Sequence, residues 1–221
     1  MGARSSAPNT LYRETICYSA EGDRKYIRYF DGRGHFGHVR LRLVPYPGES
    51  CRVSLDDACS LPGECCRAIQ DALMRRFDLE PRSHLELVGF EARVIGGTFL
   101  DHHSYPEAYA LAACMAFDEA FHRASPMVVE PYIGVSLVVE FDDLVWTIKA
   151  LGALLGEMQT TQRVTDVVRL NVDVPMRLVG TIRSMGMRIT RQFPIPSDDR
   201  YRPILTARTG DVLPDDLGEW T

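Results

Sequence analysis

Alternating apolar and polar positions dominate the first quarter of the chain. Val39, Leu41 and Leu43 alternate with polar side chains at the positions between them, the pattern of a strand with one buried face. The same alternation predicts strands at 11–19, 24–31, 37–45 and 50–56. Four strands in succession, with a turn at Pro45-Tyr46-Pro47-Gly48, predict an antiparallel meander.

Helical spacing replaces this alternation after Pro62-Gly63. Two amphipathic helices are predicted by apolar residues three or four positions apart, namely Cys66, Ile69, Leu73 and Phe77, then Ala110, Cys114, Phe117 and Phe121. The segment between them, 85–94, predicts a strand whose phase shift at Val88-Gly89 indicates a bulge. Ser104 and Glu107 have the spacing of a capping box that starts the second helix, and Ala124-Ser125-Pro126 ends it.

The remaining pattern predicts a second domain. It indicates, in order, a strand, a helix, a hairpin, a helix and a strand, at 133–140, 142–156, 157–174, 176–186 and 187–194. The order βαββαβ is that of a ferredoxin-like sandwich. The predicted organisation is therefore α+β in two domains, between a disordered N-terminus and a solvated acidic tail: 1–10, 11–128, 129–196 and 197–221.

Composition limits the number of domains and the cellular environment that we expect. With 221 residues and 45% hydrophobic side chains, the chain is long enough for two globular domains. The six cysteines are irregularly spaced and no apolar run opens the chain, so we expect reduced thiols in the cytoplasm. No apolar stretch reaches the roughly 20 residues that cross a bilayer, so we expect no membrane role.

Residues 30–39 hold the densest candidate chemistry. Three glycines, one arginine and two histidines lie within this run, which predicts a polar turn that presents side chains. Glycines let a partner approach closely, and Arg33 is a fork-shaped donor suited to phosphate or carboxylate. By spacing alone, an ordinary hairpin explains the same residues, so RNA contact stays a hypothesis here.

Charge supports that hypothesis locally. The net charge is −5, which argues against an indiscriminate nucleic-acid binder. Between positions 24 and 42, however, one acid, Asp31, stands among several cations: Arg24, Lys25, Arg28, Arg33, Arg40 and Arg42. This segment predicts a basic patch on an otherwise acidic chain.

Other polar clusters allow weaker hypotheses. His35 and His38 could bind zinc together with a second cluster, Asp101, His102 and His103. Polar loops explain these residues without a metal, so neither a metal nor a cofactor is predicted. Cysteines 59, 65 and 66 fit core packing better than a redox site. Asp101 and Glu107 could act as acid or base near His103, but Glu107 has a simpler role as a helix cap, and no enzyme is predicted.

Several motifs together carry a family resemblance. Asp31-Gly32-Arg33-Gly34-His35-Phe36-Gly37-His38-Val39 is followed by Met115-Ala116-Phe117, Glu119-Ala120-Phe121, Ala124-Ser125-Pro126 and Glu130-Pro131. In order and spacing these motifs resemble the fourth and fifth domains of bacterial translation elongation factor G. The resemblance covers about 11–195, nearly the whole chain.

The resemblance implies an architecture and a partner. In this family the fourth domain is a ribosomal-protein-like α+β module whose two tip loops reach the decoding region and help to move tRNA with mRNA. The fifth domain is ferredoxin-like and contacts ribosomal RNA. The tip loops here would be 32–37 and 98–103. The implied RNA- or ribosome-binding residues are Arg28, Gly32, Arg33, Gly34, His35, His38, Arg40, Asp101, His102 and His103.

The chain also departs from the family. Leu100 stands where the second loop usually carries a histidine, and Leu154-Leu155-Gly156 stands where the second domain usually has an Arg-Arg-Gly turn. The usual Gly-Arg-Gly turn before the last strand is represented by Met185-Gly186-Met187-Arg188, with one arginine. Fewer cations weaken phosphate binding.

A phosphate loop is absent from the sequence, whose two lysines, Lys25 and Lys149, lie in no Gly-x-x-x-x-Gly-Lys-Ser/Thr context. We therefore expect a relative without the GTPase domain, which binds no GTP and is not an enzyme. The favoured hypothesis is a translation-factor-like protein that binds the ribosome, ribosomal RNA or tRNA with mRNA. The alternative is a module that kept the fold, lost the ribosome and binds a separate protein partner.

Overall fold

The computed structural model describes residues 12–30, 33–78, 85–154, 156–164, 166–196 and 199–204. It divides into two units, Met1–Val129 and Glu130–Thr221. The division falls one residue after the expected boundary at 128. The α+β, two-domain fold predicted from the pattern is confirmed. In the parts of the chain that are described, no helix is long and apolar enough to cross a membrane.

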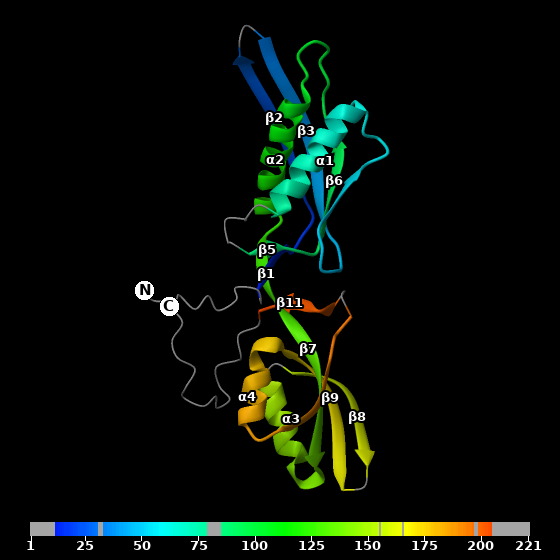
Figure 1. Ribbon diagram of the computed structural model, residues 1–221, viewed down its shortest axis with the longest axis vertical. Coiled ribbons are helices and arrows are strands. Elements are labelled where there is room, and N and C mark those ends of the chain that lie inside the picture. The colour runs from blue at the N-terminus through cyan, green and yellow to red at the C-terminus, as the bar shows by residue number, and fades with distance from the viewer. Residues whose placement is uncertain are drawn as a thin grey trace, which may run out of the picture. The chain divides into compact units, whose positions relative to one another are not determined.

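The first unit is a four-stranded sheet with two helices on one face (Figure 1). The strand order is β2-β3-β6-β4, and β2 and β3 extend well beyond the other strands. Its elements are β1 (Arg13–Ile16), β2 (Ala20–Phe30), β3 (Arg33–Pro45), β4 (Arg52–Leu55), α1 (Gly63–Asp78), β5 (Glu86–Leu87), β6 (Phe90–Gly96), α2 (Pro106–Arg123) and the first residues of β7 (Pro126–Glu140).

The predicted meander is wrong. Only β2 and β3 form an antiparallel hairpin, because β1 leaves this sheet to pair with β5 and β7. The β4 strand pairs parallel to β6, since α1 carries the chain back across the sheet between them, and such a crossover joins parallel strands. The predicted bulge is a full break: Gly89 has φ +74°, and β5 and β6 join different partners on its two sides.

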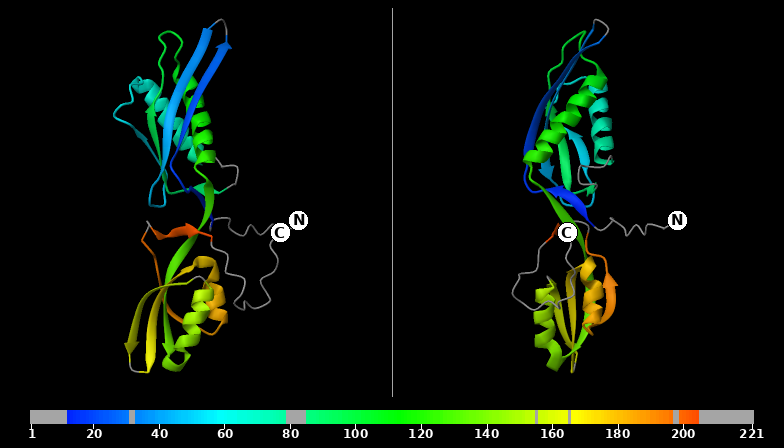
Figure 2. Two further views of the ribbon diagram at one scale, coloured as in Figure 1. Left: turned by 180° about the vertical axis from the view of Figure 1, so that it is seen from behind. Right: turned by 90° about the vertical axis from the view of Figure 1, so that its left-hand side faces the viewer.

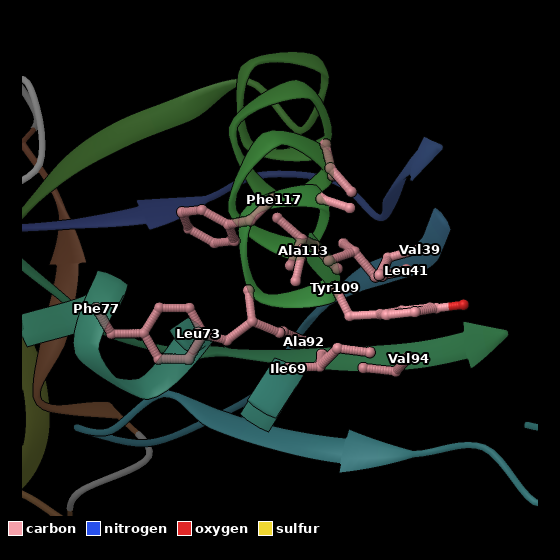
Figure 3. Packing of buried hydrophobic residues seen from close by; sticks show 14 of the residues in the cluster. Val39, Leu41, Ile69, Leu73, Phe77, Ala92, Val94, Tyr109, Ala113 and Phe117 are labelled. Carbon is pink, nitrogen blue, oxygen red and sulfur yellow. The ribbon is translucent and has the colours of Figure 1, made fainter. Parts of the chain in front are cut away.

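The core of the first unit lies between the sheet and the helices. Figure 3 shows Ile69, Leu73 and Phe77 of α1 facing Ala92 and Val94 of β6 across this core. Phe117 of α2 joins an aromatic group in which the rings of Phe77, Phe90 and Phe121 lie 5.3–6.0 Å from its centroid. The helical spacing of the sequence identified the buried stripe of α1. For α2 it was wrong at three of four positions: Phe117 is buried, but Ala110, Cys114 and Phe121 are only partly buried, and alanines supply most of the buried face.

Two glycines let α2 lie directly on the hairpin. A Cβ atom at Gly22 would collide with the Ala116 carbonyl, and one at Gly37 would lie 2.6 Å from the Tyr109 nitrogen. Both obstacles are backbone atoms of α2, so neither can turn aside as a side chain would. Gly37, in the glycine-rich run, therefore serves the packing of α2 on the hairpin.

The predicted capping box is wrong. Tyr105, not Ser104, occupies the N-cap of α2, without a side-chain cap, and Pro106 takes the first helical position, where the amide hydrogen it lacks is not needed. The Ser104 hydroxyl instead accepts a hydrogen bond from the Leu100 amide and bonds the Tyr109 hydroxyl. Glu107 is exposed.

The second unit has the predicted βαββαβ order. After β7 its elements are α3 (Leu144–Ala153), β8 (Glu157–Val164), β9 (Val167–Pro175), α4 (Val179–Ser184), β10 (Arg188–Phe193) and β11 (Tyr201–Pro203). The sheet order β10-β7-β9-β8 is antiparallel throughout. Figure 2 shows α3 and α4 against this sheet, where they cover the apolar side chains of β7 and β9. An ion pair joins the buried carboxylate of Glu130 to the partly exposed Arg177, with 2.6 Å between the carboxylate and Nε.

Part of the expected solvated tail is folded. The β11 strand pairs with β7, and the Arg200 carbonyl accepts a hydrogen bond from the Tyr132 amide. Arg202 stacks over Tyr132 and pairs with Asp173. These contacts correct the expected boundary at 197 for residues 199–204. Residues 1–10, 197, 198 and 205–221 lie outside the described residues.

Candidate nucleic-acid interface

The glycine-rich run lies mostly within a strand. Pairing of β2 with β3 continues from Ala20 and Leu43 to Phe30 and Arg33. This corrects the predicted polar turn over 30–39. Asp31 and Gly32 follow β2 in the sequence. These two residues lie outside the described residues.

The second predicted loop, 98–103, lies beside the hairpin and continues through Ser104 and Tyr105 to α2. The Phe36 amide donates a 2.7 Å hydrogen bond to the His103 carbonyl, and Phe36 forms a parallel bridge with Ser104. The His35 ring stacks on Tyr105, with centroids 4.5 Å apart. Figure 1 shows the loop before α2 at the same end as the hairpin. Together, residues 25–30, 33–36 and 98–105 form one region, called the tip below.

A buried tyrosine holds the tip loop on α2. The Tyr109 hydroxyl donates a 2.6 Å hydrogen bond to the Thr98 carbonyl, and burial raises the pKa of this tyrosine. Within the loop, the Leu100 carbonyl accepts hydrogen bonds from the amides of His103 and Ser104, and His102 has φ +70°. The loop is thus fixed at both ends, which favours a preorganised binding surface.

His38 is a structural residue, which corrects its place among the binding candidates. Its ring is buried, with Nδ1 2.8 Å from the Thr98 hydroxyl and Nε2 2.8 Å from an Asp23 carboxylate oxygen. These contacts tie β2, β3 and the start of the tip loop together. A buried ring with both nitrogens bonded has no donor left for RNA.

The predicted basic patch divides into two parts. At its base, Arg24, Arg40 and Arg42 lie against carboxylates of Glu119, Asp23 and Glu21 respectively. These acids lie outside positions 24–42 in the sequence, Glu21 and Asp23 in β2 and Glu119 in α2, so the local charge of that segment did not include them.

In the outer part of the patch, the described cations have no carboxylate beside them. Lys25 and Arg28 are exposed, and neither forms an ion pair among the described residues. The Arg33 side chain lies outside the described residues. The available positive charge therefore lies toward the end of the hairpin, on the tip.

Exposed apolar side chains on the tip were missed at the sequence level. Tyr29 is 82% exposed and Ile27 60% exposed. The Tyr29 ring lies 3.6 Å from where a Gly34 Cβ would be, so the ring lies beside this glycine of β3. The signal was available: Lys25, Ile27 and Tyr29 alternate onto one face of β2. Exposed aromatic rings beside cations are typical of surfaces that bind RNA bases.

The second cluster is exposed. Asp101, His102 and His103 lie in solvent, and only His103 approaches the hairpin, with Nδ1 3.4 Å from a Cβ position at Gly34. No group of three or more histidine, cysteine, aspartate or glutamate residues among the described residues could hold a metal ion. Of the cysteines raised as a redox site, Cys65 and Cys66 are buried in the core.

Comparison with known families agrees with this geometry. The family described as "Elongation factor G, domain IV" matches residues 8–125, which include the hairpin, the tip loop and α2. The chain belongs to this elongation factor G domain IV family.

Curated relatives extend the match. Elongation factor G of Thermotoga maritima and that of Thermotoga petrophila are each 33% identical over 141 residues, 62% of this chain. The chain spans only 20% of the length of these relatives. A crystal structure of a Thermus thermophilus protein matches with a TM-score of 0.62 at 22% identity, over 86% of this chain and 30% of that one. This last likeness supports the fold.

Proposed function

We propose that the tip of the first unit binds RNA on the ribosome, in the region where tRNA and mRNA meet. The observation that carries the proposal is the joining of two separate segments into one preorganised surface, held by the bond between Phe36 and His103. On one face of the hairpin this tip offers the exposed cation Lys25 and the exposed ring of Tyr29, and on the other face the exposed cation Arg28. Cations neutralise phosphates, and an exposed ring can stack on an unpaired base.

We infer that this region binds without performing chemistry of its own. The 221 residues contain no phosphate loop, so the proposed action needs neither GTP nor a cofactor from these residues. Membership of the domain IV family supports a binding role. Because ribosomes are the proposed partner, the proposed location is the cytoplasm.

Ribosome co-sedimentation at increasing salt tests the proposal. The Lys25→Ala, Arg28→Ala double variant removes the two tip cations. The Arg67→Ala, Arg75→Ala variant removes two exposed arginines of α1 and is the matched control. Each phosphate contact contributes about 0.7–0.9 to the slope of log affinity against log salt. The tip variant should lose about 1.4–1.8 from that slope, and the control should keep it.

Two results would overturn the proposal. The first is failure of the wild-type protein to sediment with ribosomes at any salt concentration. The second is an equal loss in the tip and control variants, which would indicate attraction by net charge alone. A stable complex with another protein that survives RNase would favour the alternative, a protein-interaction module.

A further inference from the structure

The second unit exposes an unusual set of side chains on α3. Val145 is 64% exposed, Trp146 53% and Ile148 39%. The opposite side of the helix is in the core, where Thr147 and Leu151 are buried. Isolated apolar residues on a surface need no explanation, but three within four positions of one helix form a patch.

The exposed apolar stripe of α3 ends at a glycine, Gly152. Val145, Ile148 and Gly152 are spaced three and four residues apart, so they form one stripe along the helix. A Cβ atom at Gly152 would meet no atom within 4 Å. The stripe therefore ends at a place where the backbone of a partner can approach closely.

Carboxylates surround the start of this stripe. Glu140, Asp142 and Asp143 are exposed, and none forms an ion pair among the described residues. The Asp166 carbonyl accepts a hydrogen bond from the Phe141 amide, which brings a fourth exposed carboxylate to the same end. Two cations lie nearby: Lys149, which is four positions from Val145 and shares the exposed face of the helix, and Arg163, whose guanidinium lies 4.3 Å from the Phe141 ring centroid. The carboxylates outnumber them.

This charge selects the class of partner. Carboxylates repel the phosphates of RNA. The same carboxylates would also repel the chain's own residues 205–221 as an occupant of this surface, because that segment contains four acids and one arginine. A protein segment with basic residues beside an apolar stripe matches both features of the surface.

We propose that the outer face of α3, defined by Val145, Trp146, Ile148 and Gly152, docks a protein segment that is apolar on one side and basic beside it, such as an amphipathic helix. The apolar stripe supplies the buried contact, and Glu140, Asp142 and Asp143 orient the segment through its cations. This surface is separate from the tip, so the proposal does not depend on RNA binding there.

Trp146 provides a direct reporter. Trp220 is the second of the chain's two tryptophans, so the full-length Trp220→Phe protein isolates Trp146 emission. The probe is a synthetic amphipathic peptide with leucine on one helical face and lysine on the other. Binding should shift the emission to shorter wavelength in a saturable way. A peptide with glutamate in place of lysine should bind at least about tenfold more weakly.

Variants separate docking from general attraction. Asp142→Asn with Asp143→Asn should weaken binding about fivefold, since each exposed ion pair contributes modestly. The matched control, Glu64→Gln with Asp71→Asn on the exposed side of α1, should leave it unchanged. Val145→Gln, at an exposed position, should abolish the emission shift while circular dichroism stays unchanged.

Three outcomes would overturn the proposal. Equal binding of the lysine and glutamate peptides would remove the charge argument. Equal effects of the α3 and α1 variants would show that net charge alone attracts the peptide. A Trp146 emission typical of a buried indole before any peptide is added would show that the chain already covers this face.

Discussion

Replacing Gly37 by alanine tests how α2 is seated on the hairpin. The new methyl group would lie 2.6 Å from the Tyr109 nitrogen and would collide with the Ala108 carbonyl. Real Cβ atoms essentially never approach closer than 3.0 Å. Because the obstacles are backbone atoms, α2 must move away from β3, and the tip loop that enters α2 must move with it.

Gly34 in the same strand provides a matched control. A methyl group at Gly34 would meet the His103 side chain at 3.4 Å and the Tyr29 ring at 3.6 Å, which are ordinary contact distances. Overpacking a tightly packed site costs about 1–3 kcal/mol. We therefore expect Gly37→Ala to reduce the free energy of unfolding by about 2 kcal/mol or more, and Gly34→Ala to change it by less than about 0.5 kcal/mol.

Thermal unfolding followed by circular dichroism measures the difference. For a unit of this size, about 2 kcal/mol corresponds to a fall in Tm of roughly 8 °C. A Gly37→Ala protein as stable as wild type would refute the close packing of α2 on β3. Equal destabilisation by the two substitutions would refute the distinction between the two glycines.

Three further substitutions probe the remaining structure. His38→Ala should lower the free energy of unfolding by about 1–3 kcal/mol in urea denaturation, because the groups of Thr98 and Asp23 lose their partner; no loss would contradict a structural role. Arg177→Ala should cost about 1–3 kcal/mol because it removes the partner of the buried Glu130 carboxylate, whereas Arg183→Ala, at an exposed position of α4, should have little effect. Burial raises the pKa of the Cys51 thiol from 9.0 to about 12. The unfolded chain releases this proton at lower pH than the folded chain, so the free energy of unfolding should fall as pH rises from 9.0 toward about 12. Cys51→Ala should reduce that fall. An unchanged pH profile in the variant would contradict the role of Cys51.

Local periodicity predicted most of the fold. The stripe of Ile69, Leu73 and Phe77 identified α1, and the alternating apolar residues of 168–174 identified β9. Both signals depend only on neighbouring residues and the single face that they bury. The order of elements in the second unit followed from the same reasoning.

Long-range pairing could not be predicted in this way. The parallel pairing of β4 with β6 depends on how α1 crosses the sheet, which no local pattern records. The candidate site shows the same limit. Arg40 and His38 were predicted to bind RNA, but Asp23 of β2 lies against Arg40 and Thr98 of the tip loop bonds the His38 ring. Tyr29 could have been found, because its alternation with Ile27 places both on one face of β2.

The most direct test of the proposed function is photocrosslinking from the tip. A photoreactive amino acid at position 28, on the exposed end of β2, is compared with the same amino acid at position 67 on α1, both exposed. With purified ribosomes at low salt, position 28 should crosslink to ribosomal RNA, tRNA or mRNA, and position 67 should not. Crosslinks from position 28 to protein alone, or equal RNA crosslinking from both positions, would contradict the proposal that the tip is the RNA-binding surface.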